Sequence, residues 1–549
     1  MHLILDYMIS KPQKQIIINQ YFYEYFLNKK ILDNPETFSK DDLINRIEGL
    51  SRFAYLNHTG LFYDIRTEGI LLELGRSIDE TSNEIDALIE NEDFSSKHST
   101  LHIATEIYKT GGHTRILAQL VKRSTQVDQY LILTKQKRDD LPEWFVLETS
   151  DKLRIVTLTD TLLNYTLLEK ALFLRKYSRK FERVILYVHP YDALPILSFA
   201  EVETPPVLLE NHAHSWFWLG SSISDIVFSH TEFHKKLTDK YRQVKRSTLL
   251  EIPQDDDLPK LYDRQDKREA KRRLFLDPEL TCITIIGNKS KFYPLSEEYN
   301  VFQLIKYIIE RFTKVNVIVV GLTADLEEIQ RYQLDLLRVR FVGYQAQIHD
   351  YYLASDICLD SIPEPSLGAT TMSAVIGLAC PLYKYGRTNI FNAANFFHSE
   401  LYNSLLGHSE TIKEYLGKIE FLIYNPDLRI QIATEFRNFV LDKWSASSIE
   451  KNINDVLELA NTVKHEINYI SDNKIYFDEN SHEIAGVSHL KSFYDMIMYF
   501  RTYYNIRDLV RIFAHLSKDF SNHPELLGTI YKLLANHFTF NNVLKVIRN

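Results

Sequence analysis

The sequence predicts an α/β protein with two tandem units, each a parallel sheet wound on both faces by helices, between helical N- and C-terminal extensions. Short β-branched and aliphatic runs alternate with amphipathic segments from about residue 97 to about residue 460. This alternation is the pattern of parallel strands joined by crossover helices. A charged stretch near residue 265 interrupts it once and separates the two units.

The first 96 residues are expected to form a helical extension. The segments QIIINQYFYEYFLNKKIL and SKDDLINRIEGLSRFAYL carry apolar residues at helical spacing. Ser39 stands where an N-cap residue would begin the second of these helices.

Residues 97–265 are expected to form the first Rossmann-like domain. Its strand-like runs are LHIATEIY, QYLILT, LRIVTL, VILYVHP, VLLENHAH and DIVFSH. The first run ends at the turn Gly111-Gly112, and the helix HTRILAQLVKR follows.

Residues 266–460 are expected to form the second Rossmann-like domain, and residues 461–549 a helical C-terminal extension. The second domain begins with the strand-like run CITIIG and continues through VNVIVVG, VRFVG, DICLDS and CPLYKYG. The C-terminal segment holds two amphipathic stretches that are rich in Tyr and Phe. Because aromatic surfaces are favoured at interfaces, we expect one helical end to bind a macromolecular acceptor, a second copy or a partner subunit.

Composition narrows the class of protein. Hydrophobic residues make up 45% and charged residues 25% of the chain, and the net charge is −9, so nucleic-acid binding is not expected. No run approaches the ~18 apolar residues that a membrane span needs. The three cysteines are scattered through apolar runs, which favours a reducing, cytoplasmic location.

The most informative stretch is FVGYQAQIHDYYLASDICLDSIPEPSLGATTMSAVIGLACPLYKYG. A strand ends at Gly343, a helix leads to Asp356, a strand and a Pro-rich loop follow, and a new helix is expected to begin near Gly368. The start of a helix presents free backbone N–H groups and the positive end of its dipole. This position is therefore suited to an anion such as a diphosphate.

This stretch resembles the donor-nucleotide region of glycosyltransferases with the GT-B fold, in which two Rossmann-like domains face each other. The resemblance covers roughly residues 100–460 and is strongest over 340–386. It implies transfer of a hexose from a nucleotide-activated sugar, UDP-glucose or another UDP-hexose, to a protein-, glycan- or lipid-linked acceptor. Two alternatives remain open: a nucleotide-sugar epimerase, and an inactive glycosyltransferase-like partner or chaperone subunit.

The resemblance leaves the stereochemistry of transfer open. Retaining members carry two glutamates in an E-x7-E pattern, and here Glu364 matches the first while Ser373 stands at the second. The pattern Gly368-x-Thr370-Thr371 is instead similar to that of O-GlcNAc transferase and HMW1C-type protein glucosyltransferases, which invert the anomeric centre.

Three residues are expected to act in catalysis. Lys291, after the strand CITIIG, would neutralise the leaving diphosphate, with Lys289 as the alternative. Glu364 would contact the sugar, and His113, at the start of a helix, would activate the acceptor. The residues expected to bind the donor are Gly111, Gly112, His212, Asn288, Lys291, Tyr344, Gly368, Ala369, Thr370 and Thr371.

No metal and no cofactor besides the nucleotide sugar is expected. The lysine and the helix start already supply positive charge at the diphosphate. The acidic run Asp255–Asp257 lies in the charged linker and not at the end of a strand, so it does not predict a DxD metal site. His212 and His214 lack further ligands at metal spacing.

Overall fold

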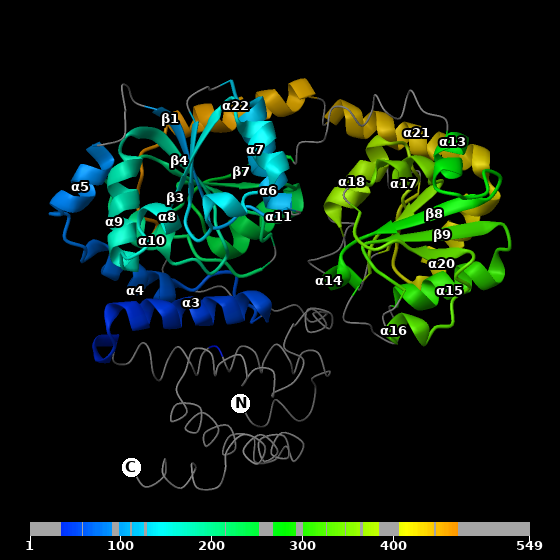
Figure 1. Cartoon of the computed structure of the whole chain (residues 1–549), viewed down its shortest axis with the longest axis horizontal. Coiled ribbons are helices and arrows are strands. Elements are labelled where there is room, and N and C mark those ends of the chain that lie inside the picture. The colour runs from blue at the N-terminus through cyan, green and yellow to red at the C-terminus, as the bar shows by residue number, and fades with distance from the viewer. Residues whose placement is uncertain are drawn as a thin grey trace, which may run out of the picture.

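The computed structural model contains two α/β domains that lie side by side (Figure 1). This confirms the fold class predicted from the sequence. The residues that the structure describes are 23, 35–57, 59–90, 98–109, 112–125, 129–214, 216–251, 267–292, 300–324, 327–345, 347–362, 366–383, 406–443 and 446–469.

The N-terminal domain is built on a seven-stranded parallel sheet with the order β3-β2-β1-β4-β5-β6-β7. The order reverses between β1 and β4, which makes the carboxyl ends of these two strands a topological switch point. The strands are β1 (His98–Ala104), β2 (Gln129–Leu133), β3 (Leu153–Thr157), β4 (Phe181–Tyr187), β5 (Val207–Glu210), β6 (Ile226–Ser229) and β7 (Ser247–Leu249).

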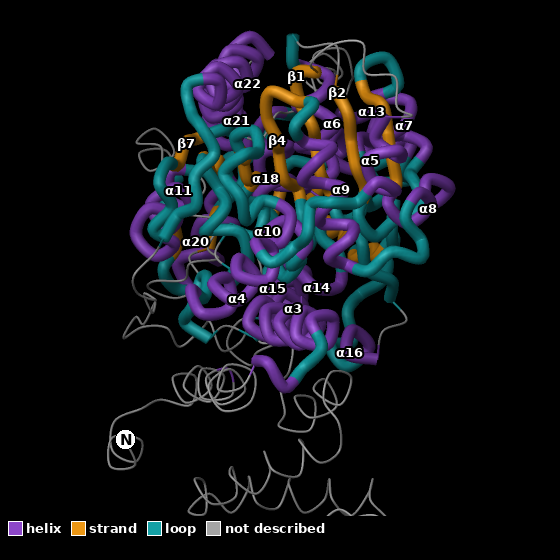
Figure 2. The backbone as a smooth tube through the Cα atoms, turned by 90° about the vertical axis from the view of Figure 1, so that its left-hand side faces the viewer, coloured by secondary structure: helices purple, strands orange, loops and turns teal. Residues whose placement is uncertain are grey.

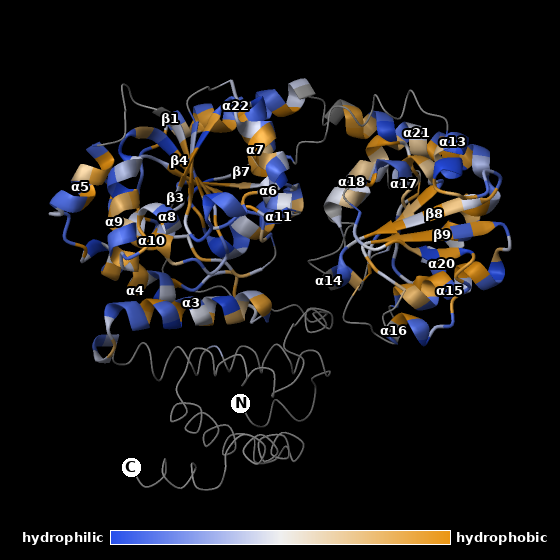
Figure 3. Cartoon of the chain, in the orientation of Figure 1, coloured by the Kyte–Doolittle hydropathy of each residue, from blue (hydrophilic) through white to orange (hydrophobic). Residues whose placement is uncertain are grey.

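Helices cover both faces of this sheet, so its central strands are almost wholly apolar and buried. Figure 3 shows strands mostly in hydrophobic colours and helices with one hydrophobic and one hydrophilic side. The helices are α6 (Gly112–Arg123), α7 (Glu143–Thr149), α8 (Leu158–Thr161), α9 (Leu167–Ser178), α10 (Leu194–Ser198) and α11 (Glu232–Leu237), with the short turns η3 (Arg138–Asp140) and η4 (Thr238–Arg242).

The C-terminal domain has a four-stranded parallel sheet with the order β10-β9-β8-β11, which reverses between β8 and β11. Its strands are β8 (Thr281–Ile286), β9 (Val315–Val320), β10 (Val339–Phe341) and β11 (Ile357–Leu359), with a separate pair β12 (Leu382–Tyr383) and β13 (His408–Ser409). Its helices are α13 (Lys267–Arg273), α14 (Lys289–Phe292), α15 (Val301–Arg311), α16 (Glu327–Gln330), α17 (His349–Ala354), α18 (Leu367–Val375), α20 (Ile412–Tyr424) and α21 (Pro426–Lys443).

Residues 35–90 are helical, as predicted, but they share one hydrophobic core with the N-terminal domain. They form η2 (Pro35–Thr37), α3 (Lys40–Leu56), α4 (Ile65–Arg76) and α5 (Asn83–Glu90). Ser39 caps α3 by accepting a hydrogen bond from the backbone N–H of Asp42, as its position in the sequence predicts.

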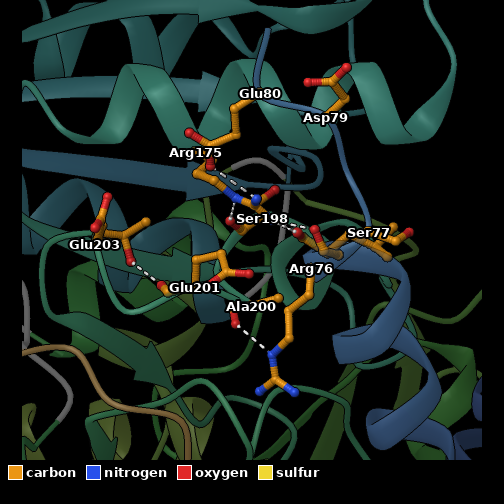
Figure 4. A network of polar contacts seen from close by, with 12 residues as sticks. Arg76, Ser77, Asp79, Glu80, Arg175, Ser198, Ala200, Glu201 and Glu203 are labelled. Carbon is orange, nitrogen blue, oxygen red and sulfur yellow. Dashed lines mark hydrogen bonds and ion pairs between the residues drawn. The ribbon is translucent and has the colours of Figure 1, made fainter.

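A buried arginine joins this helical segment to the sheet domain (Figure 4). The Arg175 guanidinium of α9 donates to the carbonyls of Gly75, Leu197 and Ser198 at 2.8–2.9 Å and to the Glu80 carboxylate at 3.2 Å. Gly75 is required at this crossing because an added Cβ would lie 2.7 Å from the carbonyl oxygen of Leu197. The close approach of α4 and α10 therefore makes this segment part of the domain.

A buried carboxylate makes a second junction. Glu68 of α4 accepts the backbone N–H groups of Gly220, Ser221 and Ser222 at 2.8, 3.1 and 2.7 Å. Burial raises the pKa of Glu68 above its ordinary value, although these hydrogen bonds favour its charged form. The loop before β6 thus depends on α4 for its hydrogen bonds.

The helix α22 (Ala446–Asn461) runs from the C-terminal domain back over the N-terminal one (Figure 1). Its apolar side chains Ile449, Ile453 and Val456 belong to the core beside β1 and β4. In Figure 2, α22 lies at the opposite end of the molecule from α3 and α4. The sequence placed residues up to 460 with the second unit, and the structure differs because the apolar side of α22 is buried on the first.

The segment after α22 also binds the N-terminal domain. His465 contacts the Asp225 carboxylate through Nδ1 at 2.8 Å, and the N–H of Glu466 donates to the same carboxylate at 2.9 Å. The N–H of Asn468 donates to the carbonyl of Ser222 at 2.7 Å.

A chain ended after Asn461 is expected to be less stable than a chain ended after Tyr469 by about 3 kcal/mol or more. Only the shorter chain leaves the buried Asp225 carboxylate without His465, and a buried charge deprived of its partner is costly. Urea unfolding of the two truncated chains measures the difference. Equal midpoints and slopes would contradict the prediction.

Candidate functional site

At the carboxyl edge of the C-terminal sheet, a glycine follows each of three strands. Gly287 follows β8, Gly321 follows β9 and Gly343 follows β10. A Cβ on Gly321 would lie 2.0 Å from the carbonyl oxygen of Gly287, and the φ of Gly321 is +102°. The N–H of Gly321 donates to the carbonyl of Gly343 at 2.7 Å. These contacts bring the three strand ends close together next to α14.

The helix α18 starts at this edge, one residue before the predicted Gly368. Its N-cap residue Ser366 makes no side-chain cap, and the first N–H that finds a helical partner is that of Thr370. Among the described residues, none accepts a hydrogen bond from the N–H groups of residues 367–369. A Cβ on the exposed Gly368 would meet nothing within 4 Å. The first turn thus offers backbone donors that a ligand can approach.

The side chains of the two threonines that were predicted to bind the donor are buried. Thr370 and Thr371 are each 2% exposed, and the Thr370 hydroxyl donates to the carbonyl of Ser366 at 3.0 Å. The groups at this helix start that can donate a hydrogen bond to an anion are therefore backbone N–H groups, including those of Gly368 and Ala369.

A buried carboxylate holds the loop that leads to α18. Asp360, directly after β11, accepts the N–H groups of Ser361 and Ser366 at 2.8 Å each. Burial raises the pKa of Asp360 to about 6, although these hydrogen bonds and the charge of Lys291 act in the opposite direction. The loop between β11 and α18 is thus fixed at both of its ends.

The helix α14, which carries Lys291, lies on the side of the C-terminal domain that faces the N-terminal domain (Figure 1). Its charge acts on Asp360 in its own domain and on His214 in the N-terminal domain. Burial lowers the pKa of His214 most, and the neighbouring histidines and Lys291 lower it further. Lys291 therefore stands within electrostatic range of a group in each domain.

The other donor-side residues lie close by in the chain or outside the described residues. Asn288 and Lys289 are exposed at the start of α14, and Tyr344, 68% exposed, follows Gly343. Glu364, Gly111 and the run Asp255–Asp257 lie outside the described residues.

In the N-terminal domain, the loops after β1 and β4 are tied together at the switch point. The Thr105 hydroxyl donates to the Asp192 carboxylate at 2.7 Å and accepts the N–H of His189 at 2.8 Å. The Tyr108 hydroxyl lies 2.7 Å from Nε2 of His189, and the two rings are stacked.

The predicted base, His113, lies on the first turn of α6 after the exposed Gly112. Its ring contacts the rings of Tyr108 and His212, each at a centroid distance of 5.2 Å. Nε2 faces the carbonyl of Glu106 at 3.4 Å. Burial lowers the pKa of His113 to about 4, so its ring is neutral at pH 7.

His212 belongs to a buried acid–histidine chain that the sequence analysis did not single out. Its Nδ1 lies 2.8 Å from one oxygen of Glu210, and Nε2 of His230 lies 2.5 Å from the other. Burial alone would raise the pKa of Glu210, but the two histidines lower it to about 2. The sequence held only a weak signal for this pair, since Glu210 is the last residue of β5 and His212 lies two residues later in the turn that follows.

The described residues hold no group of three or more His, Cys, Asp or Glu side chains placed to ligate a metal ion. None of the described helices combines the length and apolar character that crossing a membrane requires. The three cysteines, Cys282, Cys358 and Cys380, are free and buried.

Comparison with known proteins finds no matching family model and no matching curated protein. Solved structures do match. HepE of Anabaena, solved in complex with UDP, aligns over 66% of this chain and 100% of its own, with a TM-score of 0.51 and 13% identity. A glycosyltransferase from Rickettsia africae aligns over 66% of this chain and 98% of its own, also with a TM-score of 0.51 and 13% identity. The chain therefore has the GT-B fold, in which glycosyltransferases pair two Rossmann-like domains.

Proposed function

We propose that the protein is a glycosyltransferase that moves a hexose from a UDP-linked donor to a protein-, glycan- or lipid-linked acceptor. The observation that carries this proposal is the start of α18, with its backbone N–H donors, at the β8/β11 switch point within the charge field of Lys291. The diphosphate of a nucleotide sugar carries two negative charges and matches such donors and a lysine. The UDP found in HepE, a structure of the same fold, supports the choice of nucleotide.

On the donor side, each group has a defined role in this proposal. The N–H groups of Gly368 and Ala369 bind diphosphate oxygens, and the Lys291 ammonium neutralises the charge that develops as UDP leaves. Asn288 and Tyr344 flank the nucleotide from the neighbouring strand ends, and Glu364 orients the sugar.

On the acceptor side, the histidines that follow β1 and β5 are the candidates for the base. His113 and His212 contact each other, and Gly111 and Gly112 allow a close approach of the acceptor or donor to the backbone between β1 and α6. Binding of a macromolecular acceptor or a second subunit through the helical ends is also part of this proposal.

A panel of nucleotide sugars tests the function. We expect UDP-hexoses to raise the melting temperature of the protein, which should release UDP and a transferred or free hexose. A free epimerised nucleotide sugar as product would identify an epimerase. Binding without any turnover in the presence of cell-derived glycan and protein acceptors would identify an inactive partner subunit, and no binding at all would refute the proposal.

Chelation of divalent ions is expected to leave the activity intact. In this mechanism the lysine and the helix start carry the diphosphate charge, so no step depends on Mg²⁺ or Mn²⁺. UDP release from UDP-glucose is measured before and after dialysis against EDTA. A loss of activity that Mn²⁺ or Mg²⁺ restores, but Na⁺ does not, would contradict the metal-independent mechanism.

A further inference from the structure

We infer that His212 is the general base of this reaction, held in position by Glu210 and His230, and that transfer therefore inverts the anomeric centre. This inference rests on the proposed function and adds to it the acceptor-side chemistry. It differs from the expectations that His113 activates the acceptor and that His212 binds the donor.

The orientation of His212 follows from its contact with Glu210. An ionised carboxylate only accepts hydrogen bonds, so the proton of the neutral His212 ring is on Nδ1, which lies 2.8 Å from the carboxylate. The lone pair is then on Nε2. Among the described residues, none forms a hydrogen bond with this nitrogen, and a fifth of the side-chain surface is exposed. An acceptor hydroxyl can therefore reach Nε2.

Glu210 is itself fixed from the opposite side. Its second oxygen lies 2.5 Å from Nε2 of His230, and Nδ1 of His230 lies 2.8 Å from the carbonyl of Leu250. Both ring nitrogens of His230 therefore contact oxygen atoms. Glu210 and His230 are each at most 3% exposed, so the chain of contacts is shielded from water. His212 is the one member of this chain that an acceptor can reach.

The electrostatics favour His212 over His113. Burial alone would lower the pKa of His212, but the Glu210 carboxylate raises it above its ordinary value. The groups that face His212 are Glu210 of β5, His230 after β6, His113 of α6, His189 after β4 and His214 in its own loop. Nε2 of His113 lies 3.4 Å from the carbonyl of Glu106 and 3.5 Å from the Thr114 hydroxyl, and the pKa of His113 is about 4, so this ring is a weak base at neutral pH.

The chemical step is a single displacement. The acceptor O–H bond breaks, its proton moves to Nε2 of His212, and the oxygen attacks the anomeric carbon. The bond between that carbon and the β-phosphate oxygen breaks, and its electron pair leaves with UDP. Attack from the face opposite the leaving group inverts the anomeric configuration, and Glu210 stabilises the imidazolium that forms.

Hydrolysis of UDP-glucose, with water as acceptor, tests the inference without knowledge of the natural acceptor. We expect His212→Gln to lower kcat by about 10²- to 10⁴-fold, the usual contribution of a general base. Thermal stabilisation by UDP should stay as in the wild type, because His212 does not bind the diphosphate. The matched variant His113→Gln should lower kcat by less than a tenth of the factor that His212→Gln produces. A larger loss of kcat in His113→Gln than in His212→Gln would assign the base to His113 and overturn the inference.

Glu210→Gln tests the positioning role by a pH profile. The substitution keeps the shape of the side chain but removes the charge that raises the pKa of His212. That pKa should therefore fall, and the acid limb of kcat/KM should move to lower pH while kcat decreases. An unmoved limb would show that Glu210 only supports the fold.

The stereochemistry provides a readout that needs no variant. Proton NMR of the glucose first released from UDP-α-glucose should show the β-anomer, and release of the α-anomer would overturn the inference. If the wild type neither binds nor consumes any nucleotide sugar, the proposed function fails. A wild type that consumes UDP-glucose while His212→Gln remains fully active refutes only the assignment of His212.

Discussion

Replacement of Lys291 by alanine is expected to lower kcat/KM for the UDP-sugar by about 10- to 150-fold while the fold stays intact. A hydrogen bond to a charged group contributes about 1.5–3 kcal/mol, and each 1.4 kcal/mol corresponds to a factor of ten. Lys291 is half-buried on the four-residue helix α14, and its charge reaches both Asp360 and His214. Steady-state kinetics with varied UDP-glucose, together with a melting curve, measure the effect.

Lys289→Ala is the matched control. This lysine lies in the same short helix but is exposed, so its removal should change kcat/KM less than about threefold. If Lys289→Ala produces the larger loss, the diphosphate role belongs to Lys289. If neither variant changes the kinetics, the diphosphate is neutralised by another group and the donor half of the mechanism is wrong.

Replacement of Gly321 by alanine is expected to destabilise the C-terminal domain by about 2–5 kcal/mol. The Cβ would lie 2.0 Å from a backbone oxygen of Gly287, and the φ of +102° is one that residues with a side chain rarely adopt. Backbone strain costs about 1–3 kcal/mol and overpacking a similar amount. Because Gly287 leads into α14, UDP binding should weaken as well.

Gly417→Ala is a control in the same domain that is expected to increase stability instead of lowering it. Gly417 lies within α20, and an added Cβ would meet nothing within 4 Å. Alanine is favoured over glycine by about 1 kcal/mol in a helix interior, so this variant should raise the midpoint of urea unfolding. An unchanged midpoint for Gly321→Ala would show that the turn after β9 relaxes without cost.

Local pattern was sufficient to predict the strands and most of the helices. Runs such as CITIIG and VNVIVVG form β8 and β9 because buried parallel strands need continuous apolar residues. The start of α18 at Leu367 follows from the Pro-rich loop that precedes it and lies one residue before the glycine from which it was predicted. These features depend on neighbouring residues in the chain, so the sequence reveals them directly.

Associations between distant segments were not predicted. The sequence showed helices before residue 97 but not that Glu68 and Arg175 join them to the N-terminal sheet domain. The amphipathic pattern of α22 required a partner, and only the structure shows that this partner is the first domain. A hydrophobic face specifies burial but not the surface that buries it.

The candidate site, too, was predicted only in part. By itself the sequence determined the fold class. It also led to the proposal that the start of α18 and Lys291 bind the diphosphate, because both depend on a strand, a turn and a helix that follow one another in the chain. Only the tertiary structure placed Lys291 near His214 and joined Glu210, His212 and His230, which come from the ends of two strands 20 residues apart. The reason is physical: protonation and charge depend on which groups meet across the sheet edge, and that is decided by strand order and domain packing.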